Sequence, residues 1–230
     1  MNLLAVAFVC WTASARAADP SATTTEGAGG TVYAGSGVYG TGWIVTGGYF
    51  FKDTMFYSRG RGGPLVSVGR AFKVFRWIGV WTGGGVLGAR GTMDTAGAGS
   101  IFRTTFDETV VYTELGIITP WLPFPVSLSL YRHSTDLTDA GVAGAAAGRS
   151  FTGRKAGIGL GVDVRVQFEF FFTKRRAGHR GLGLVAGYCG FMDMTGRALT
   201  TTDTNGATLT HPKWKPFAGE GLQLGLEYEF

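Results

Sequence analysis

The stretch YRHSTD, residues 131–136, contains residue types that can cleave an ester or amide bond. A histidine can act as a general base, and a serine hydroxyl that it activates can act as the nucleophile of acyl transfer. His133 and Ser134 are adjacent, however, and adjacent side chains of a β-strand point to opposite faces. No glutamate lies nearby to orient the imidazole, and Asp136 is the acid of the stretch. If this stretch is a strand, the histidine and the serine do not form a catalytic pair.

Other motifs with chemical meaning lack the context that each would need. GSGVYG, residues 35–40, fits the dinucleotide-binding fingerprint, but no βαβ pattern follows it. His133, His179 and His211 are far apart and have no cysteine or carboxylate at metal-ligand spacing. The formal net charge of +5 is modest and does not favour a nucleic acid as partner. We therefore expect no cofactor, no metal ion and no nucleic-acid partner.

The first residues predict export. An apolar segment precedes small residues of the kind at which signal peptidases cleave, so we interpret residues 1–17 as a signal peptide. A short membrane anchor is the alternative, although the apolar segment is shorter than the ~20 residues that a spanning helix needs. Loss of Cys10 would leave Cys189 as the only cysteine and exclude an internal disulfide. Residues 18–40 are expected to form a flexible lead-in.

The elements that must position the remaining residues are long β-strands. In residues 154–172 one parity is apolar from Ile158 to Phe170, and the other carries glycine, charged and amide side chains. At ~3.3 Å per residue this strand is roughly 40 Å or more in length. A tilted strand crosses a bilayer in ~9–11 residues. This strand is therefore long enough to cross a membrane and to project beyond it.

Similar alternation predicts eight strands in all. Short connections alternate with longer ones, as in a transmembrane β-barrel with short turns at one end and longer loops at the other. Aromatic residues near the strand ends predict two belts at the membrane interfaces. The belt at the long-loop end consists of Tyr49, Phe51, Phe102, Phe106, Phe151, Phe191 and Phe217. The predicted strands are residues 41–52, 64–75, 77–90, 104–118, 124–134, 154–172, 181–195 and 217–230, and the longer connections are residues 53–63, 91–103, 135–153 and 196–216.

Composition favours a membrane barrel over a soluble one. Hydrophobic residues make up 45% of the chain and charged residues 16%, against about 25% charged in typical soluble domains. A soluble lipocalin-like barrel with apolar side chains inside is the alternative, but it would need a polar exterior. We therefore predict an all-β fold, an antiparallel up-and-down transmembrane β-barrel of eight strands formed by residues 41–230.

The final decapeptide, GLQLGLEYEF, carries a recognisable pattern. Its apolar residues alternate with polar ones and lead to a last aromatic residue. The decapeptide resembles the C-terminal assembly signal of bacterial outer-membrane proteins, and the mature chain resembles the small eight-stranded barrels of the OmpA-domain, OmpX and OmpW type. The resemblance implies the cell outer membrane as location, the barrel-assembly machinery as partner, and lipid against the apolar face of the last strand. The residues of this assembly signal are Leu222, Leu224, Leu226, Tyr228 and Phe230.

With the apolar parity outside, the polar parity must fill the lumen. The interior of an eight-stranded barrel has room only for side chains, and buried charges must be paired or hydrogen-bonded. Both signs of charge are present, so we predict a closed, salt-bridged lumen. In segment 64–75, Arg70 and Lys73 have opposite parity and leave the facing of that strand open. The predicted lumen charges are Glu108, Glu114, Lys155, Asp163, Arg165, Glu169, Glu227 and Glu229.

Arginines near the long loops form a second candidate site. Guanidinium groups pair bidentately with phosphates, and lipopolysaccharide headgroups carry phosphates. We therefore interpret these arginines as a rim that faces lipopolysaccharide, with solvated loop charges as the alternative. The residues of the rim are Arg90, Arg103, Arg132 and Arg154.

These patterns favour a non-enzymatic barrel with a structural, adhesive or complex-anchoring role. Its expected partners are outer-membrane lipid, lipopolysaccharide and other envelope proteins. A narrow channel for a small solute is one alternative. A lipid A-modifying acyl hydrolase is another, since some eight-stranded outer-membrane barrels are lipid A deacylases that use a histidine and a serine two residues apart. Here Thr135 occupies the position two residues after His133, which departs from that pattern.

Overall fold

The described part of the chain folds into one antiparallel β-sheet. The computed structural model describes residues 43–53, 61–75, 78–97, 99–119, 122–171 and 181–229. Within these ranges no helix is long and apolar enough to cross a membrane. The strands are β1 (Trp43–Lys52), β2 (Gly62–Phe75), β3 (Ile78–Gly97), β4 (Ser100–Thr119), β5 (Leu122–Ala143), β6 (Ser150–Phe171), β7 (Gly181–Asp193), β8 (Arg197–Thr202), β9 (Thr208–Trp214) and β10 (Gly219–Glu229).

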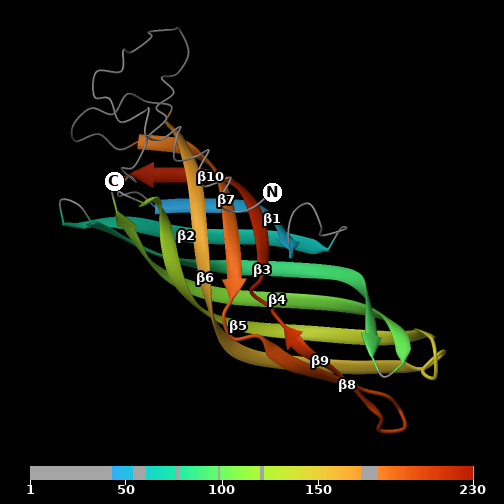
Figure 1. Ribbon diagram of the computed structural model, residues 1–230. Helices are drawn as coiled ribbons and strands as arrows, with labels where there is room; N and C mark the ends of the chain where they lie inside the picture. Colours follow the sequence, from blue (N-terminus) through green and yellow to red (C-terminus); the bar gives the residue numbers. More distant parts are fainter. Residues whose placement is uncertain are drawn as a thin grey trace.

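Eight of the ten strands close into a ring. Strands β1 to β7 pair in chain order, and β10 completes the ring between β7 and β1. Trp43 of β1 lies opposite Tyr228 of β10, so the start of β1 and the end of β10 lie at the same end of the barrel (Figure 1). Each of the eight predicted strands overlaps one strand of this ring. The signal peptide and lead-in predicted for residues 1–40 lie outside the described residues.

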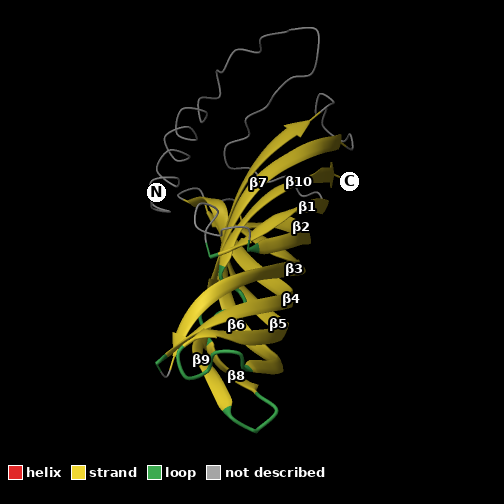
Figure 2. Ribbon diagram, turned by 90° about the vertical axis from the view of Figure 1, so that its right-hand side faces the viewer, coloured by secondary structure: helices red, strands yellow, loops and turns green. Residues whose placement is uncertain are grey.

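The prediction of residues 196–216 as a loop was wrong, because this segment contains the β8–β9 hairpin. The ladder between β6 and β7 ends at Asp193, followed by one backbone hydrogen bond from Met194 to Leu160. Further along β6, strand β8 pairs with it, with Thr202 opposite Thr152. Figure 2 shows the hairpin beside β6, at the end of the barrel away from the end of β10. The sheet therefore has ten strands.

Strands β3 to β6 are much longer than the others. They contain 20, 20, 22 and 22 residues, against 10 in β1 and 11 in β10. Most of the predicted loops 91–103 and 135–153 is therefore strand. Many outward side chains of these outer portions are polar, among them Thr92, Asp94 and Asp136, so the regular apolar alternation that identified strands elsewhere is missing there. Gly99, with φ of 71°, allows the tight turn between β3 and β4.

Large aliphatic side chains cover much of the outside of the ring, and a set of charged side chains is buried inside it. Leu224 is 71% exposed and Leu115 is 62% exposed, whereas Glu108 and Arg165 are each 1% exposed. A soluble protein has the opposite distribution. The alternation therefore places these aliphatic side chains on the outside of the ring and these charged groups in the lumen.

Strand β2 faces in one direction up to a β-bulge. The ladder between β2 and β3 shifts register between Lys73 and Phe75, and a bulge of this kind accommodates one extra residue. Arg70 lies on the outward parity, with its guanidinium 5.7 Å from the ring of Trp43 and 5.0 Å from that of Phe72. Arg70 is thus an outward cation of this strand, near the end of the barrel at which β1 begins and β10 ends.

The predicted aromatic belt at the long-loop end was largely wrong. Phe102, Phe106, Phe151, Phe191 and Phe217 are all buried inside the sheet. They lie on the same parity as the lumen charges, where they fill space between strands. Aromatic clustering near strand ends did not separate a belt from an interior packing layer, because aromatic side chains favour strands in both settings.

Candidate functional site

An ion pair crosses the lumen in the layer nearer the short-turn end. Nη2 of Arg165 lies 2.7 and 2.9 Å from the two carboxylate oxygens of Glu114. Trp81 donates its indole N–H to the same carboxylate at 2.8 Å, and Arg165 donates a further hydrogen bond to Ser67 at 2.9 Å. Strand β5 separates β4 from β6 in the ring, so this contact closes the barrel internally rather than along the sheet.

Aromatic rings close the middle of the lumen. Phe217 stacks on Tyr131 with ring centroids 5.1 Å apart and meets Phe191 edge-on at 5.1 Å. Gly161 lies beneath these rings, and a Cβ at this position would overlap the ring of Phe217. Packing of this kind leaves room for side chains alone. We call this layer the lumen plug; it consists of Phe50, Tyr112, Tyr131, Phe191 and Phe217.

Two carboxylates tie the chain segment 214–217 into the lumen above the plug. Glu108 pairs with Lys52 at 2.7 Å and accepts the indole N–H of Trp214 at 2.7 Å. The Lys52 ammonium also donates to the backbone oxygen of Lys215 at 2.7 Å. Asp193 accepts the backbone N–H of Phe217 at 3.2 Å and the Tyr131 hydroxyl at 2.6 Å. The segment that returns from the β8–β9 hairpin is therefore fixed inside the barrel.

The predicted lumen charges divide into three groups. Glu108, Glu114, Asp163, Arg165 and Glu227 are buried, and Asp163 accepts a hydrogen bond from the Ser129 hydroxyl. The prediction that Lys155 is a buried lumen charge was wrong, because its side chain is exposed although it lies on the lumen parity. It lies between the last β6 residue that pairs with β7 and the one that pairs with β8, where its side chain reaches solvent. The side chains of Glu169 and Glu229 lie outside the described part of the chain.

Sequence reasoning missed three residues that complete these layers, Lys52, Trp81 and Trp214, and it assigned a fourth, Phe217, to the outward aromatic belt. Lys52 is the last residue of β1, a strand that we predicted. Its carboxylate partner, Glu108, is on β4, which is not a neighbour of β1 in the sheet. The stretch WKPF, residues 214–217, joins the predicted loop 196–216 to the predicted last strand and contains two large aromatic residues. Those aromatic residues were the signal that could have indicated a buried segment.

His133 and Ser134 lie on opposite faces of β5. His133 is buried in the lumen, and its Nδ1 is 3.1 Å from the Thr135 hydroxyl. Ser134 is on the outward parity, as is Asp136, which pairs with Arg154. The structure therefore does not bring the imidazole, the serine hydroxyl and a carboxylate of this stretch together.

A buried hydrogen-bond cluster joins the hairpin to the outer portions of β4 and β5. Asp139 accepts hydrogen bonds from Thr104 and Thr201, each at 2.6 Å, and lies 3.0 Å from Nε2 of His211. Burial alone would raise the pKa of Asp139, but the hydrogen bonds from His211, Thr104 and Thr201 outweigh it and hold the pKa below its usual value. The ionised carboxylate of Asp139 therefore holds the hairpin against β4 and β5.

The outer face of β3–β6 carries two polar rows at successive levels. The first, which we call the charged row, has directly opposed residues in the order Arg90, Asp107, Asp136 and Arg154. Arg90 and Arg154 each pair with the neighbouring aspartate, at 2.8 and 3.4 Å. The second, the threonine row, has directly opposed residues in the order Thr92, Thr105, Thr138 and Thr152.

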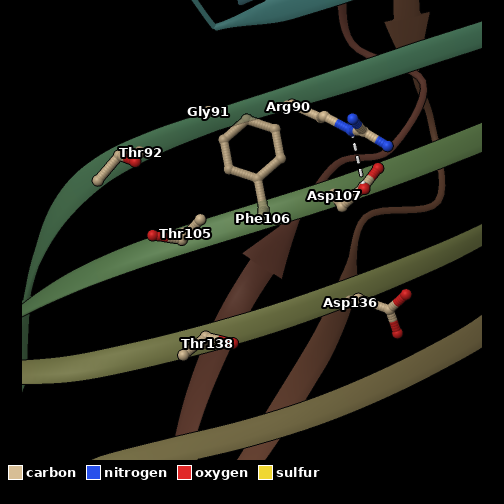
Figure 3. Close-up of a pocket in the computed structure, with 8 residues that line it drawn as sticks. All are labelled: Arg90, Gly91, Thr92, Thr105, Phe106, Asp107, Asp136 and Thr138. Carbon is tan, nitrogen blue, oxygen red and sulfur yellow. Dashed lines mark ion pairs between the residues drawn. The ribbon is translucent and has the colours of Figure 1, made fainter.

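A shallow pocket of ≈ 420 Å³ lies between these two rows. Figure 3 shows Thr92, Thr105 and Thr138 on neighbouring strands, with the Arg90–Asp107 ion pair beside them. Its floor includes Gly91 and Phe106, which are directly opposed. The pocket therefore offers hydroxyl groups and charged groups on the outside of the barrel.

The four arginines of the predicted rim are not equivalent. Arg90 and Arg154 belong to the charged row, and Arg103 lies 3.5 Å from Asp94. Arg132 is exposed and has no acidic partner among the described residues. It is directly opposed by Val111 on one side and by Ile158 on the other. One arginine of the four is therefore set in an apolar surrounding.

The predicted assembly signal lies on the outside of β10 as far as the structure describes it. Leu222, Leu224, Leu226 and Tyr228 are exposed on the outward parity. Phe230 lies outside the described residues, so its role remains a prediction.

No family model matches the chain, and no curated protein matches it. Among solved structures, a major outer membrane protein from Thermus thermophilus is similar, with 15% identity, a TM-score of 0.40, and coverage of 82% of this chain and 99% of that chain. CarO of Acinetobacter baumannii is similar with 14% identity, a TM-score of 0.35, and coverage of 84% and 98% respectively. The chain's own geometry, a closed antiparallel ring with apolar side chains outside and ion pairs inside, is that of a transmembrane β-barrel.

Proposed function

We propose that the chain is an integral barrel of the cell outer membrane whose lumen is closed and whose function lies on its outer surface. The observation that carries this proposal is the filled lumen. Two ion-paired layers, around Glu114 and Glu108, enclose the lumen plug. Side chains that fill an eight-stranded barrel in this way would leave no continuous water path for a solute through the part of the lumen that the described residues form.

The length of β3–β6 supports an interactive or structural role. Strand β4 has 20 residues, about twice the 9–11 that a tilted strand needs to cross the bilayer. Its outward residues change from Ile117 and Leu115 to Asp107, Thr105 and Arg103. The polar portion, to which the β8–β9 hairpin is hydrogen-bonded, would project above the membrane. It would present a rigid surface for adhesion or for anchoring other envelope proteins.

Conductance in a planar lipid bilayer tests the closed lumen. The protein is refolded into vesicles, its folded state is verified by heat-modifiable gel mobility, and it is then fused with the bilayer. We expect no stable openings, while a general diffusion porin in the same bilayer serves as the positive control. Reproducible openings from the folded protein would instead support the narrow solute channel.

A further inference from the structure

Within the described residues, Arg132 is a cation without a counter-charge on the apolar outer face. Its directly opposed neighbours, Val111 and Ile158, are apolar and exposed, and Leu130 precedes it on the same parity. The other three arginines of the rim each have an aspartate within 3.5 Å. In a membrane-spanning barrel this position is the edge of the apolar surface nearer the β8–β9 hairpin. An outward cation there costs free energy unless an anion neutralises it.

Polar groups follow directly above Arg132. Thr109 and Ser134 are directly opposed one step further along the strands. The charged row comes next, and it is neutral as a unit because two arginines face two aspartates. The threonine row and its pocket lie above that. An unneutralised guanidinium at the lipid boundary, followed by hydroxyl groups, matches a molecule that has acyl chains, then a phosphate, then sugar hydroxyls.

The height of this surface favours a glycolipid over a phospholipid. From Val111 to Arg103 the outward face of β4 runs for eight residues, about 26 Å along the strand at ~3.3 Å per residue, which is roughly 19 Å of height for a strand tilted by ~45°. The headgroup region of one leaflet of a phospholipid bilayer is only roughly 5–8 Å thick. A phospholipid would therefore meet Arg132 and leave the pocket uncovered, whereas the saccharide of a glycolipid would reach it.

We infer that the outer face of β3–β6 binds a phosphorylated glycolipid of the surrounding leaflet, with Arg132 contacting the phosphate and the threonine row facing the sugar. The inference rests on the proposed membrane location. A guanidinium fits this role because its fork of N–H groups meets two phosphate oxygens at once.

Native mass spectrometry of lipid retained by the folded protein tests the inference. Wild type, Arg132→Gln and the control Arg103→Gln are refolded into phosphatidylcholine vesicles that contain bis-phosphorylated lipid A, and are then released into detergent. We expect Arg132→Gln to lower the retained lipid A about tenfold, since a charge-assisted contact is lost. Arg103→Gln, whose arginine is already paired, should remain within about twofold of wild type.

Three further arms identify the ligand. Dephosphorylated lipid A and phosphatidylglycerol should each be retained less than bis-phosphorylated lipid A, and millimolar inorganic phosphate should not displace it. Equal retention of either lipid, displacement by free phosphate, or an unchanged Arg132→Gln variant would overturn the inference. Gel mobility of the wild type distinguishes failure of the proposed function from failure of this inference. A protein that does not fold into vesicles contradicts the proposed function, whereas a folded protein without phosphate selectivity contradicts this inference alone.

Discussion

Arg165 and Glu114 meet face to face across the lumen although 51 residues and one intervening strand separate them. Both are buried, and the pair holds Trp81 and Ser67 by further hydrogen bonds. Because the carboxylate and the guanidinium leave water together, each depends on the other for its neutralisation. The pair therefore acts as an internal strut between β4 and β6.

Removal of one partner of this pair should destabilise the barrel strongly. Glu114→Gln removes the hydrogen-bonded counter-charge of the buried Arg165 guanidinium, and we expect a loss of about 3–5 kcal/mol in the free energy of unfolding. Urea titration of the protein in lipid vesicles, followed by gel mobility, measures it. Asp136→Asn is the matched control, because its ion pair is exposed and contributes about 0–1 kcal/mol. Equal losses in the two variants would contradict the strut.

A methyl group at Gly161 should disturb the lumen plug. Gly161→Ala places a Cβ against the ring of Phe217, and overpacking of this kind costs about 1–3 kcal/mol. The double variant with Phe217→Leu frees space and should regain part of the loss, measured by the same titration. Additive losses in the double variant would show that the ring of Phe217 does not limit the site.

The lipid-facing side of β10 should tolerate size changes but not charge. Leu224→Arg puts a cation on the exposed apolar face, where the cost approaches about 2–4 kcal/mol near mid-membrane. Leu224→Val keeps the face apolar and serves as control, and refolding yield in vesicles followed by urea titration compares the two. If the arginine variant refolds with wild-type stability, the outward assignment of this parity is wrong.

Acidification should loosen the β8–β9 hairpin before the ring. The pKa of Asp139 is held below its unfolded value, so its contribution is present above the unfolded pKa, about 3.9, and disappears as the pH falls through the folded pKa. Hydrogen exchange of the β8 and β9 amides at pH 6 and pH 3 measures it. Asp139→Asn should show weaker protection at pH 6 and little further change at pH 3. A hairpin that loses protection equally in both proteins on acidification would implicate other groups.

The histidine and serine of β5 should be dispensable for lipid chemistry. Mass spectrometry of lipid A from cells with and without the protein should show no acyl chain released, because the imidazole of His133 is in the lumen and the hydroxyl of Ser134 is outside. Loss of an acyl chain that requires the protein and is abolished by His133→Ala would establish the acyl hydrolase. Ser134→Ala then tests the nucleophile.

Local pattern determined the strands and their faces. Alternation in residues 154–172 and in the final decapeptide specifies which side chains share a face, because successive residues of a strand point to opposite sides. This placed Glu108, Glu114 and Arg165 inside and Leu224 outside before any tertiary contact was known. It failed for the outer portions of β3–β6, where both faces of the strand carry polar residues and the alternation has no contrast.

Tertiary structure alone decided which groups meet. Lys52 pairs with Glu108, Arg165 pairs with Glu114, and Phe217, which the alternation placed at the start of the last strand, packs inside the barrel as part of the turn that precedes β10. It also decided that Arg90 and Arg154 are neutralised by Asp107 and Asp136, while no described acid neutralises Arg132. These contacts depend on the stagger between strands when the ring closes, and stagger is a property of the whole sheet that no single strand's sequence encodes.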